Sequence, residues 1–370
     1  MKIFNKFDLK TTIIIFLFPA ISILCIPLYI HNYGIVWQEP ALLFFGWILS
    51  GLGITVGYHR YFSHKSFKAN QFFEWIFMIF GTMAIQKSIL QWCSNHRQHH
   101  KKLDTDKDPY SIKKGFFHAH VGWILENKSF AIKGVSDLKK KKAVAFQAKY
   151  YWSLTILISF IIPLLIGFSY GRPIGALLWG VILRITLVHH FTWFINSLCH
   201  YVGTKQYNFN ISARDSWYMA LFTFGEGYHN FHHTFEWDYR NGIRWYDFDP
   251  SKWVVKFLSY FKITYDLKIV SDTNIFKAKL KSLQQRIEFV SKKYSISDNY
   301  NEILNEYIKK SFQQLELLET LEKKYRNFNL SKLNEIDRKK IDFKKKFHYR
   351  EIQNAISSVM MMLVNVKALN

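Results

Sequence analysis

The sequence predicts an all-α membrane protein with four transmembrane helices, a cytoplasmic helical cap that holds a histidine-rich metal site, and a helical C-terminal extension. Three observations predict this fold class. Hydrophobic residues make up 49% of the chain although its formal charge is +23, and apolar and charged residues are segregated along the sequence, which a soluble domain does not require. Nine histidines form clusters in the first two thirds. The residues after about position 270 carry apolar side chains at helical spacing among Lys, Glu and Gln.

Four apolar segments are long enough to cross a bilayer. Residues 11–30 carry no charged side chain and have about the twenty residues that the hydrocarbon core requires. The other three segments are residues 41–58, 151–170 and 174–198, the last interrupted by Arg184 and by His189 and His190. They form two predicted hairpins. The first segment is long and other spans follow it, so we interpret it as a membrane anchor and not as a cleaved signal peptide.

Basic residues predict how these spans are oriented. The two loops inside the hairpins, residues 31–40 and 171–173, contain only Arg172, whereas residues 1–10, 60–149 and the tail are dense in Lys and Arg. By the positive-inside rule both termini and the central segment are cytoplasmic, in a bacterial inner membrane or the endoplasmic reticulum. Residues 71–89 are apolar but include Glu74, Gln86 and Lys87, so we expect an interfacial or re-entrant helix that does not cross.

The clustered histidines predict a metal site, because neutral imidazole is a nitrogen donor that suits iron, copper, zinc or nickel. Nine donors exceed what one four-coordinate ion uses, which favours two metals. In each HxxHH motif the imidazoles share one helix face, whereas His59 and His64 are five apart, so we expect the helix to end or distort there. The nine are His59, His64, His96, His99, His100, His200, His229, His232 and His233. The remaining six lack the pattern and are interpreted as structural: His31, His118, His120, His189, His190 and His348.

The motifs together resemble those of the membrane-bound acyl-CoA (stearoyl-type, delta-9) fatty acid desaturases. They are HRYFSH, NHRQHHKKLDTDKDPY with GFFHAHVGW, NSLCH and GEGYHNFHH, within residues 51–244. The resemblance implies a four-span fold whose cytoplasmic cap holds two iron ions. It implies that the box histidines and His200 are the ligands, with Asn196 acting through a water molecule.

The same resemblance implies the reaction. Dioxygen and two electrons would be used to remove two neighbouring hydrogens from a saturated acyl chain, leaving a cis double bond whose position is set by a closed, bent tunnel. Some desaturases carry a fused cytochrome b5 with an HPGG signature, but here the only histidine after His233 is His348. Electrons would therefore come from a separate ferredoxin, rubredoxin-like protein or cytochrome b5.

Substrate contacts are predicted with alternatives left open. Trp92, Thr192 and Trp193 match tunnel-lining positions of the family, although Trp193 is equally interpreted as ordinary helix packing. Asp104, Asp106 and Asp108 would orient ligating histidines or form a capped turn.

The acyl carrier is open as well. A cytoplasmic set of lysines would attract the phosphates of coenzyme A or of lipid head groups, or is simply a solvated face; it comprises Lys101, Lys102, Lys113, Lys114 and Lys139–Lys142. Animal members have an arginine and an aspartate before the second box, where this chain has Ser94 and Asn95. An acyl chain in a lipid or on another thioester therefore stays an alternative to acyl-CoA.

The chain divides into a predicted desaturase domain, residues 1–270, and a basic extension, residues 271–370. Residues 276–293, 301–326 and 341–366 are expected to be helices that pack on the cap, lie along an anionic membrane, pair with a partner, or remain a partly ordered tail.

Two other functions stay open: a membrane hydroxylase with the same histidine boxes, and a metal-binding membrane protein without enzymatic activity. The positive charge follows the membrane topology, so no nucleic-acid partner is expected.

Overall fold

The computed structural model describes residues 9–126, 131–294, 296–326 and 335–368, and most of them are helical. The chain divides into two compact units. The first comprises Met1–Gly203 and Ser212–Ile269, and the second comprises Thr204–Ile211 and Val270–Asn370. In the part of the chain that is described, the only sheet is the pair β1 (Lys68–Ala69) and β2 (Thr264–Tyr265).

Four helices of the first unit are long and apolar enough to cross a membrane: Ile14–Tyr33, Gln38–Ser63, Lys142–Ser169 and Pro173–His200. This confirms the predicted fold class. The spans consist of α1 (Leu9–Tyr33); α2 (Gln38–Leu52) with the π-helix η2 (Gly53–Ser63); α7 (Lys142–Ile156), η5 (Leu157–Ile161) and α8 (Ile162–Ser169); and α9 (Pro173–Leu177), η6 (Leu178–Leu183), α10 (Arg184–Ser197) and η7 (Leu198–His200). The third begins before the expected residue 151 and is kinked at Tyr150 (φ −113°, ψ 23°).

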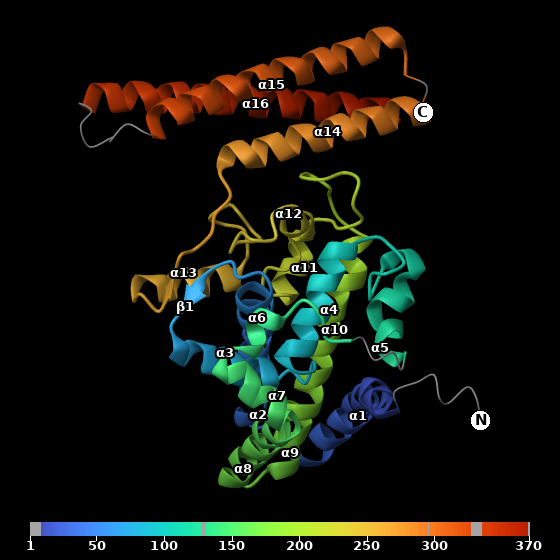
Figure 1. The fold of residues 1–370 in the computed structure, drawn as a ribbon. Coiled ribbons are helices and arrows are strands. Elements are labelled where there is room, and N and C mark those ends of the chain that lie inside the picture. The colour runs from blue at the N-terminus through green and yellow to red at the C-terminus, as the bar shows by residue number, and fades with distance from the viewer. Residues whose placement is uncertain (1–8, 127–130, 295, 327–334, 369–370) are drawn as a thin grey trace. The chain divides into compact units, whose positions relative to one another are not determined.

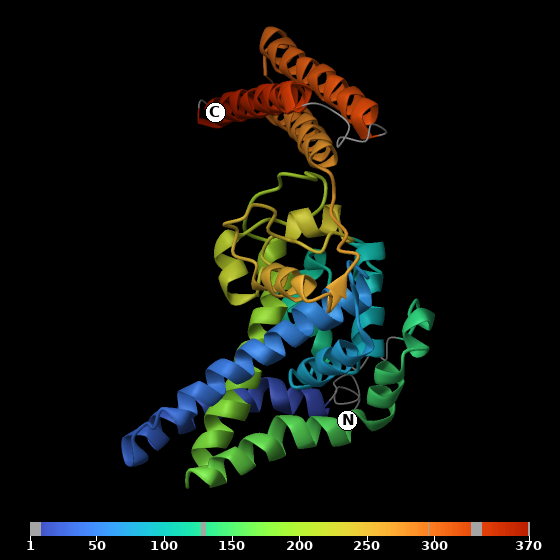
Figure 2. The same ribbon diagram turned by 90° about the vertical axis from the view of Figure 1, so that its left-hand side faces the viewer.

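The turns inside the two hairpins are held together by the arginine that the sequence places there. Arg172 donates from Nε to the Tyr29 hydroxyl at 2.9 Å, and its Nε lies 3.1 Å from the buried carboxylate of Glu39. The guanidinium also donates to the carbonyls of Tyr33 and Gly34 at 3.0 and 2.8 Å. Figures 1 and 2 show α8 and α9 at the end of this unit opposite α12 (His229–Thr234). The arginine therefore joins the two hairpins far from the histidine boxes.

The π-helix η2 packs closely on α3 (Gln71–Thr82). A Cβ atom on Gly53 would lie 2.3 Å from the backbone nitrogen of Gly81, so only glycine fits at this contact. The α3 helix begins at Asn70, whose side chain accepts from the backbone of Phe73. It is shorter than the interfacial helix expected over residues 71–89, because a turn with positive φ at Ile85 (54°) and Lys87 (75°) intervenes.

The rest of the first unit forms a cap over the ends of the spans that carry the histidine boxes. Its largest helix, α4 (Ile89–Lys102), begins at the capping side chain of Ser88. The other elements are η3 (Ile112–Lys114), η4 (His118–Gly122), α5 (Trp123–Leu125), α6 (Ser136–Lys139), α11 (Trp217–Phe222), α12 and α13 (Pro250–Tyr260). A shared core joins η2, α3, α4 and α13, with buried members that include Phe62, Phe77, Ile89 and Val255.

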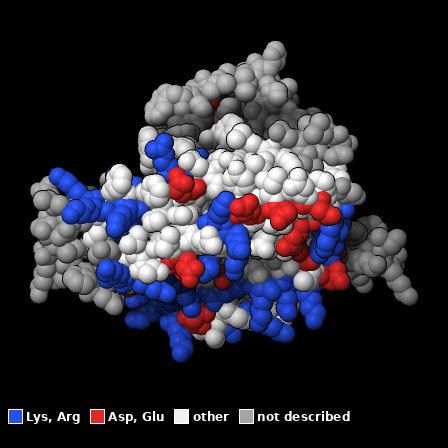
Figure 3. All heavy atoms as spheres, turned by 90° about the horizontal axis from the view of Figure 1, so that it is seen from above, with Lys and Arg blue, Asp and Glu red and all other residues white. Residues whose placement is uncertain are grey.

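The second unit is a bundle of three helices, α14 (Asp272–Tyr294), α15 (Asp298–Arg326) and α16 (Glu335–Ala368). Buried residues of α14 recur at alternating steps of four and three, the repeat of a helix-packing seam: Phe276, Leu280, Leu283, Ile287 and Val290. They meet a matching set on α15 and α16: Leu304, Ile308, Leu315, Leu318, Ile352, Val359 and Leu363. Figure 3 shows Lys and Arg crowded along one edge of the face seen from above, with Asp and Glu among them.

Replacing Gly53 by alanine is expected to destabilise the first unit, because the new methyl group has no room beside α3. Overpacking of this kind costs about 1–3 kcal/mol. The thermal midpoint of the purified protein in detergent measures the effect. Gly122→Ala is the control, since its Cβ would meet its nearest neighbour at an ordinary 3.4 Å. An unchanged midpoint for Gly53→Ala contradicts the close helix contact.

Candidate metal centre

The nine box histidines converge into two groups. Within each group the ligand atoms all lie within 4.8 Å of one another. The first group has five members: His59, His64, His96, His100 and His232. The second has four: His99, His200, His229 and His233. None of the other six histidines joins either group. Among the described residues the structure thus brings the nine box histidines together and leaves the other six outside these groups.

Local helix geometry explains how distant segments present their rings together. At the end of η2 the backbone nitrogen of His64 donates to the carbonyl of His59 at 3.1 Å, a π-helical hydrogen bond that spans five residues where an α-helix spans four. The helix does end and distort within the first box, as expected. The ring centroids of His59 and His64 lie 4.8 Å apart. The α4 and α12 helices supply the HxxHH motifs, and η7 supplies His200.

The contacts between rings have a pattern that hydrogen bonds alone do not satisfy. His232 Nε2 lies 2.9 Å from His59 Nε2 and 3.1 Å from His100 Nε2. His229 Nε2 lies 3.0 Å from the Nε2 atoms of both His200 and His233. A ring nitrogen of neutral imidazole makes one in-plane bond, as donor or as acceptor. A cation that accepts several lone pairs resolves both crowded positions, and imidazole suits iron among other metals.

Polar partners on the far side of the rings orient four of the histidines. His99 Nδ1 donates to Asp108 at 2.8 Å, and His200 Nδ1 lies 2.7 Å from the Ser212 hydroxyl. His59 Nδ1 lies 2.9 Å from Glu226, and His100 Nδ1 lies 2.9 Å from Glu236. A proton held on Nδ1 leaves the Nε2 lone pair free for a metal.

Of the acidic run in the second box, two members reach the site. Asp108 contacts His99, and Asp104 accepts from the backbone of Ser212 at 2.7 Å, which holds the residue beside His200. Asp106 contributes its carbonyl oxygen to Lys114 at 3.2 Å.

Burial lowers the pKa of six of these histidines and so keeps them neutral. It lowers the pKa of His100 to about 4, although the Glu236 contact raises that pKa. Burial, reinforced by neighbouring rings, also holds the pKa of other members well below the usual value: His64, His96, His229, His232 and His233. Uncharged imidazole is the form that binds metal, so the folded chain presents the site ready for ions.

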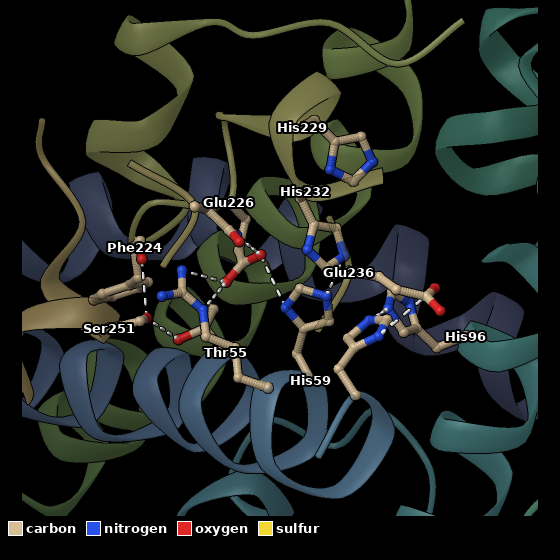
Figure 4. A network of polar contacts seen from close by, with 12 residues as sticks. Thr55, His59, His96, Phe224, Glu226, His229, His232, Glu236 and Ser251 are labelled. Carbon is tan, nitrogen blue, oxygen red and sulfur yellow. Dashed lines mark hydrogen bonds and ion pairs between the residues drawn. The ribbon is translucent and has the colours of Figure 1, made fainter. Parts of the chain in front are cut away.

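A buried ionic network supports the first group (Figure 4). Arg60 donates to Glu226 at 3.0 Å, and the same guanidinium nitrogen lies 2.9 Å from Asp249. Asn241 donates to the other oxygen of Glu226 at 2.6 Å. Burial alone would raise the pKa of the Glu226 carboxyl, but His59 and Arg60 hold it below its usual value. Glu226 thus remains an anion beside the metal ligands.

Beneath the histidines lies a cavity of about 430 Å³, within the range of about 300–1,000 Å³ typical of small-molecule sites. All three predicted substrate residues line it: Trp92, Thr192 and Trp193. Asn196 lines it too, together with His99 and His229. Gln86 bridges two of the walls, donating to the Thr192 hydroxyl at 3.0 Å and accepting from Trp92 Nε1 at 3.2 Å.

The structural histidines have other contacts. His189 lies 2.8 Å from the carbonyl of Ala84, and His120 lies 3.1 Å from both His190 and the Ser197 hydroxyl. His348, in the second unit, lies 2.7 Å from Gln314.

The site also includes residues that were not predicted, among them Arg60, Gln86, Ser212, Glu226 and Glu236. Arg60 follows His59 directly, and Glu226 precedes His229 by three residues within GEGYH. A charge that must be buried beside an apolar helix needs a partner, and this was the available signal for Arg60. The partners themselves lie far away in the sequence.

The four apolar helices indicate a multi-spanning membrane protein, and each of the two histidine groups has the donors to hold a metal ion. Residues 36–266 match the fatty acid desaturase family. The chain belongs to this family, which confirms the resemblance that the motifs indicated.

Three relatives illustrate the similarity. A probable acyl-CoA desaturase of Schizosaccharomyces pombe is 41% identical over 243 residues, 65% of this chain and 51% of that protein. Acyl-CoA desaturase 1 of Saccharomyces cerevisiae is 38% identical over 247 residues, 66% of this chain and 48% of that protein. The sn-1 stearoyl-lipid 9-desaturase of Synechocystis is 34% identical over 264 residues, 70% and 81% of the two chains. The chain spans about half the length of the two yeast proteins.

Replacing Arg60 by methionine is expected to destabilise the protein strongly, because Glu226 and Asp249 would be left as buried charges without this partner. Removing one member of a buried ionic group costs about 3–5 kcal/mol. Thermal unfolding in detergent measures the loss. The control is Lys68→Met, which removes a solvent-exposed pair with Asp266 and should change little. Equal stability of the two variants contradicts the proposed support.

Proposed function

We propose that the protein catalyses the oxygen-dependent desaturation of a saturated fatty acyl chain, at the delta-9 position and as acyl-CoA, to a cis-monounsaturated chain. The observation that carries the proposal is the location of two all-nitrogen metal groups at one wall of a cavity with aromatic and aliphatic lining. A saturated chain has no polar handle at the reacting carbon, so its position must be fixed by the walls around it.

The cofactor we propose is a pair of iron ions. The groups of five and four histidines would hold one ion each, and Asn196 would reach the second through a water molecule. Iron with dioxygen supplies an oxidant strong enough for an unactivated methylene. The polar partners Glu226, Asp108, Ser212 and Glu236 support the assignment, because oriented neutral imidazoles are what such ions require.

The chain's own side chains would place the substrate. Trp92 stacks on His96 with ring centroids 4.9 Å apart and an angle of 26°. This part of the cavity wall is therefore held in place relative to a proposed metal ligand. Gln86 ties Trp92 to Thr192 on α10. The bridge would bend the acyl chain next to the first metal group, and the buried rings would keep water from the reacting carbons.

We further propose that both termini and the metal centre face the cytoplasm. Arg172 is the one Lys or Arg in the loops far from the boxes, and it joins the two hairpins. The loops on the box side are rich in lysine. A separate ferredoxin, rubredoxin-like protein or cytochrome b5 would supply electrons there.

An acyl-lipid substrate is the second candidate. The Synechocystis relative is named for a stearoyl-lipid, and Ser94 and Asn95 stand where animal acyl-CoA enzymes carry an arginine and an aspartate. Here Ser94 contacts the backbone of Lys133 at 2.9 Å, and Asn95 lines the cavity while accepting from Gln91. Neither brings the charge that those enzymes direct at coenzyme A.

Expression in a host that lacks unsaturated acyl chains tests the reaction. Mass spectrometry of the host lipids, with double-bond localisation, is expected to find new cis-monounsaturated chains. Sampling the acyl-CoA and lipid pools early after induction identifies the carrier, because the new double bond appears first in the pool that is the substrate. Hydroxylated chains without new double bonds would instead assign the protein as a hydroxylase. No change, with no oxygen consumed on adding reductant and substrate, would favour a non-enzymatic metal-binding protein.

Replacing His232 by alanine is expected to abolish desaturation and lower the iron content per chain, because His232 Nε2 contacts two other members of the first group. Lipid profiling and elemental analysis of the purified protein measure the two effects. His348→Ala, a change in the second unit, is the control and should retain both. Continued turnover by His232→Ala contradicts its role as a ligand.

A further inference from the structure

The four polar partners of the metal-site histidines differ in their exposure. The side chains of Asp108 and Glu226 are only 1% and 2% exposed, whereas that of Glu236 is 53% exposed. Ser212 is held by a backbone contact to Asp104. Glu236 is therefore the one partner among these four that faces solvent to this degree.

Glu236 reaches two members of the first group. Its Oε2 lies 2.9 Å from His100 Nδ1 and 4.0 Å from His64 Nδ1, whose side chains are only 6% and 4% exposed. Figure 4 shows the Glu236 carboxylate beside the rings on the side opposite Glu226. The residue follows α12 in a turn closed by the backbone nitrogen of Asp238, which donates to the carbonyl of Phe235 at 2.9 Å. The turn thus fixes the backbone of Glu236, and its exposed carboxylate lies against the five-histidine group.

We infer that Glu236 is a positioning residue for the five-histidine metal, and that the exposure of this carboxylate leaves that metal the more readily exchanged of the two. The inference rests on the proposed function in one respect, namely that both histidine groups hold iron. A carboxylate that accepts from Nδ1 fixes the ring orientation and makes the Nε2 donor more basic. Its negative charge also favours a bound cation.

The exposure of Glu236 gives the asymmetry. A hydrogen bond at the surface competes with water and is screened by salt, whereas a buried one is not. The four-histidine group has Asp108 in the buried position, with His99 donating to it at 2.8 Å. Loss of ligand orientation by thermal motion of the side chain is therefore easier at His100 than at His99.

Chelator-driven iron release from the full chain tests the inference. The protein in lipid nanodiscs is loaded anaerobically with ferrous iron, and release to a coloured ferrous chelator is followed with time. Two phases of similar amplitude are expected. Glu236→Ala should speed the faster phase about tenfold, the lower end of the 10–100-fold effect of losing such a partner, and leave the slower phase unchanged. Asp108→Ala should speed the slower phase.

Conservative variants separate positioning from a structural role. Glu236→Gln keeps an oxygen that can accept from His100, so its release rate should lie between those of wild type and Glu236→Ala. Glu236→Asp withdraws the carboxylate by one methylene and should resemble Glu236→Ala. Asp266→Ala, which removes an exposed carboxylate paired with Lys68, is the matched control and should leave both phases as in wild type.

The outcomes distinguish this inference from the proposed function. Two phases that are both insensitive to Glu236→Ala, or both accelerated equally, would overturn the inference and leave the paired centre intact. A wild-type chain that binds fewer than two iron ions would overturn both.

Discussion

The structure depends on bringing nine imidazoles into one buried volume. Each ring nitrogen that leaves water must find a donor, an acceptor or a cation. The crowded Nε2 atoms of His232 and His229 have two ring neighbours each, which makes a shared cation the natural partner. Four segments far apart in the chain must therefore be held within a few ångströms, and the long helices and the cap provide that rigidity.

Buried charged side chains beside the site connect these segments to one another. Arg60 comes from the π-helix η2, Glu226 from the loop before α12, and Asp249 caps α13 by accepting from the backbone of Lys252 at 2.9 Å. Because all three are buried, removing one leaves buried charge on the others without its partner. One ionic network therefore fixes the end of the second span, the third histidine box and a cap helix relative to one another, and Glu226 passes that constraint to His59.

Much of this architecture follows from the sequence, because hydropathy and histidine spacing are local signals. The four spans, the convergence of the nine box histidines and the distortion at His59 and His64 could be predicted in this way; their division into groups of five and four could not. The partners of the histidines could not, since Ser212, Glu226 and Glu236 are polar residues in loops with no periodic pattern. Residues 83–88 were also predicted to continue an interfacial helix, which is wrong because α3 ends at Thr82 and α4 begins at Ile89. Their apolar character favours a helix, but positive φ at Ile85 and Lys87 reverses the chain instead.

That reversal links the metal site to the shape of the cavity. It points Gln86 at Trp92 and Thr192, and Trp92 stacks on the ring of His96 one turn further along α4. The helix that carries a proposed metal ligand thus also carries the wall that would bend the substrate. With both on one rigid element, the distance between the metal and the bend cannot drift independently of the helix. A double-bond position set by geometry needs a constant distance between the metal and the bend, because the methylenes of a saturated chain are chemically alike.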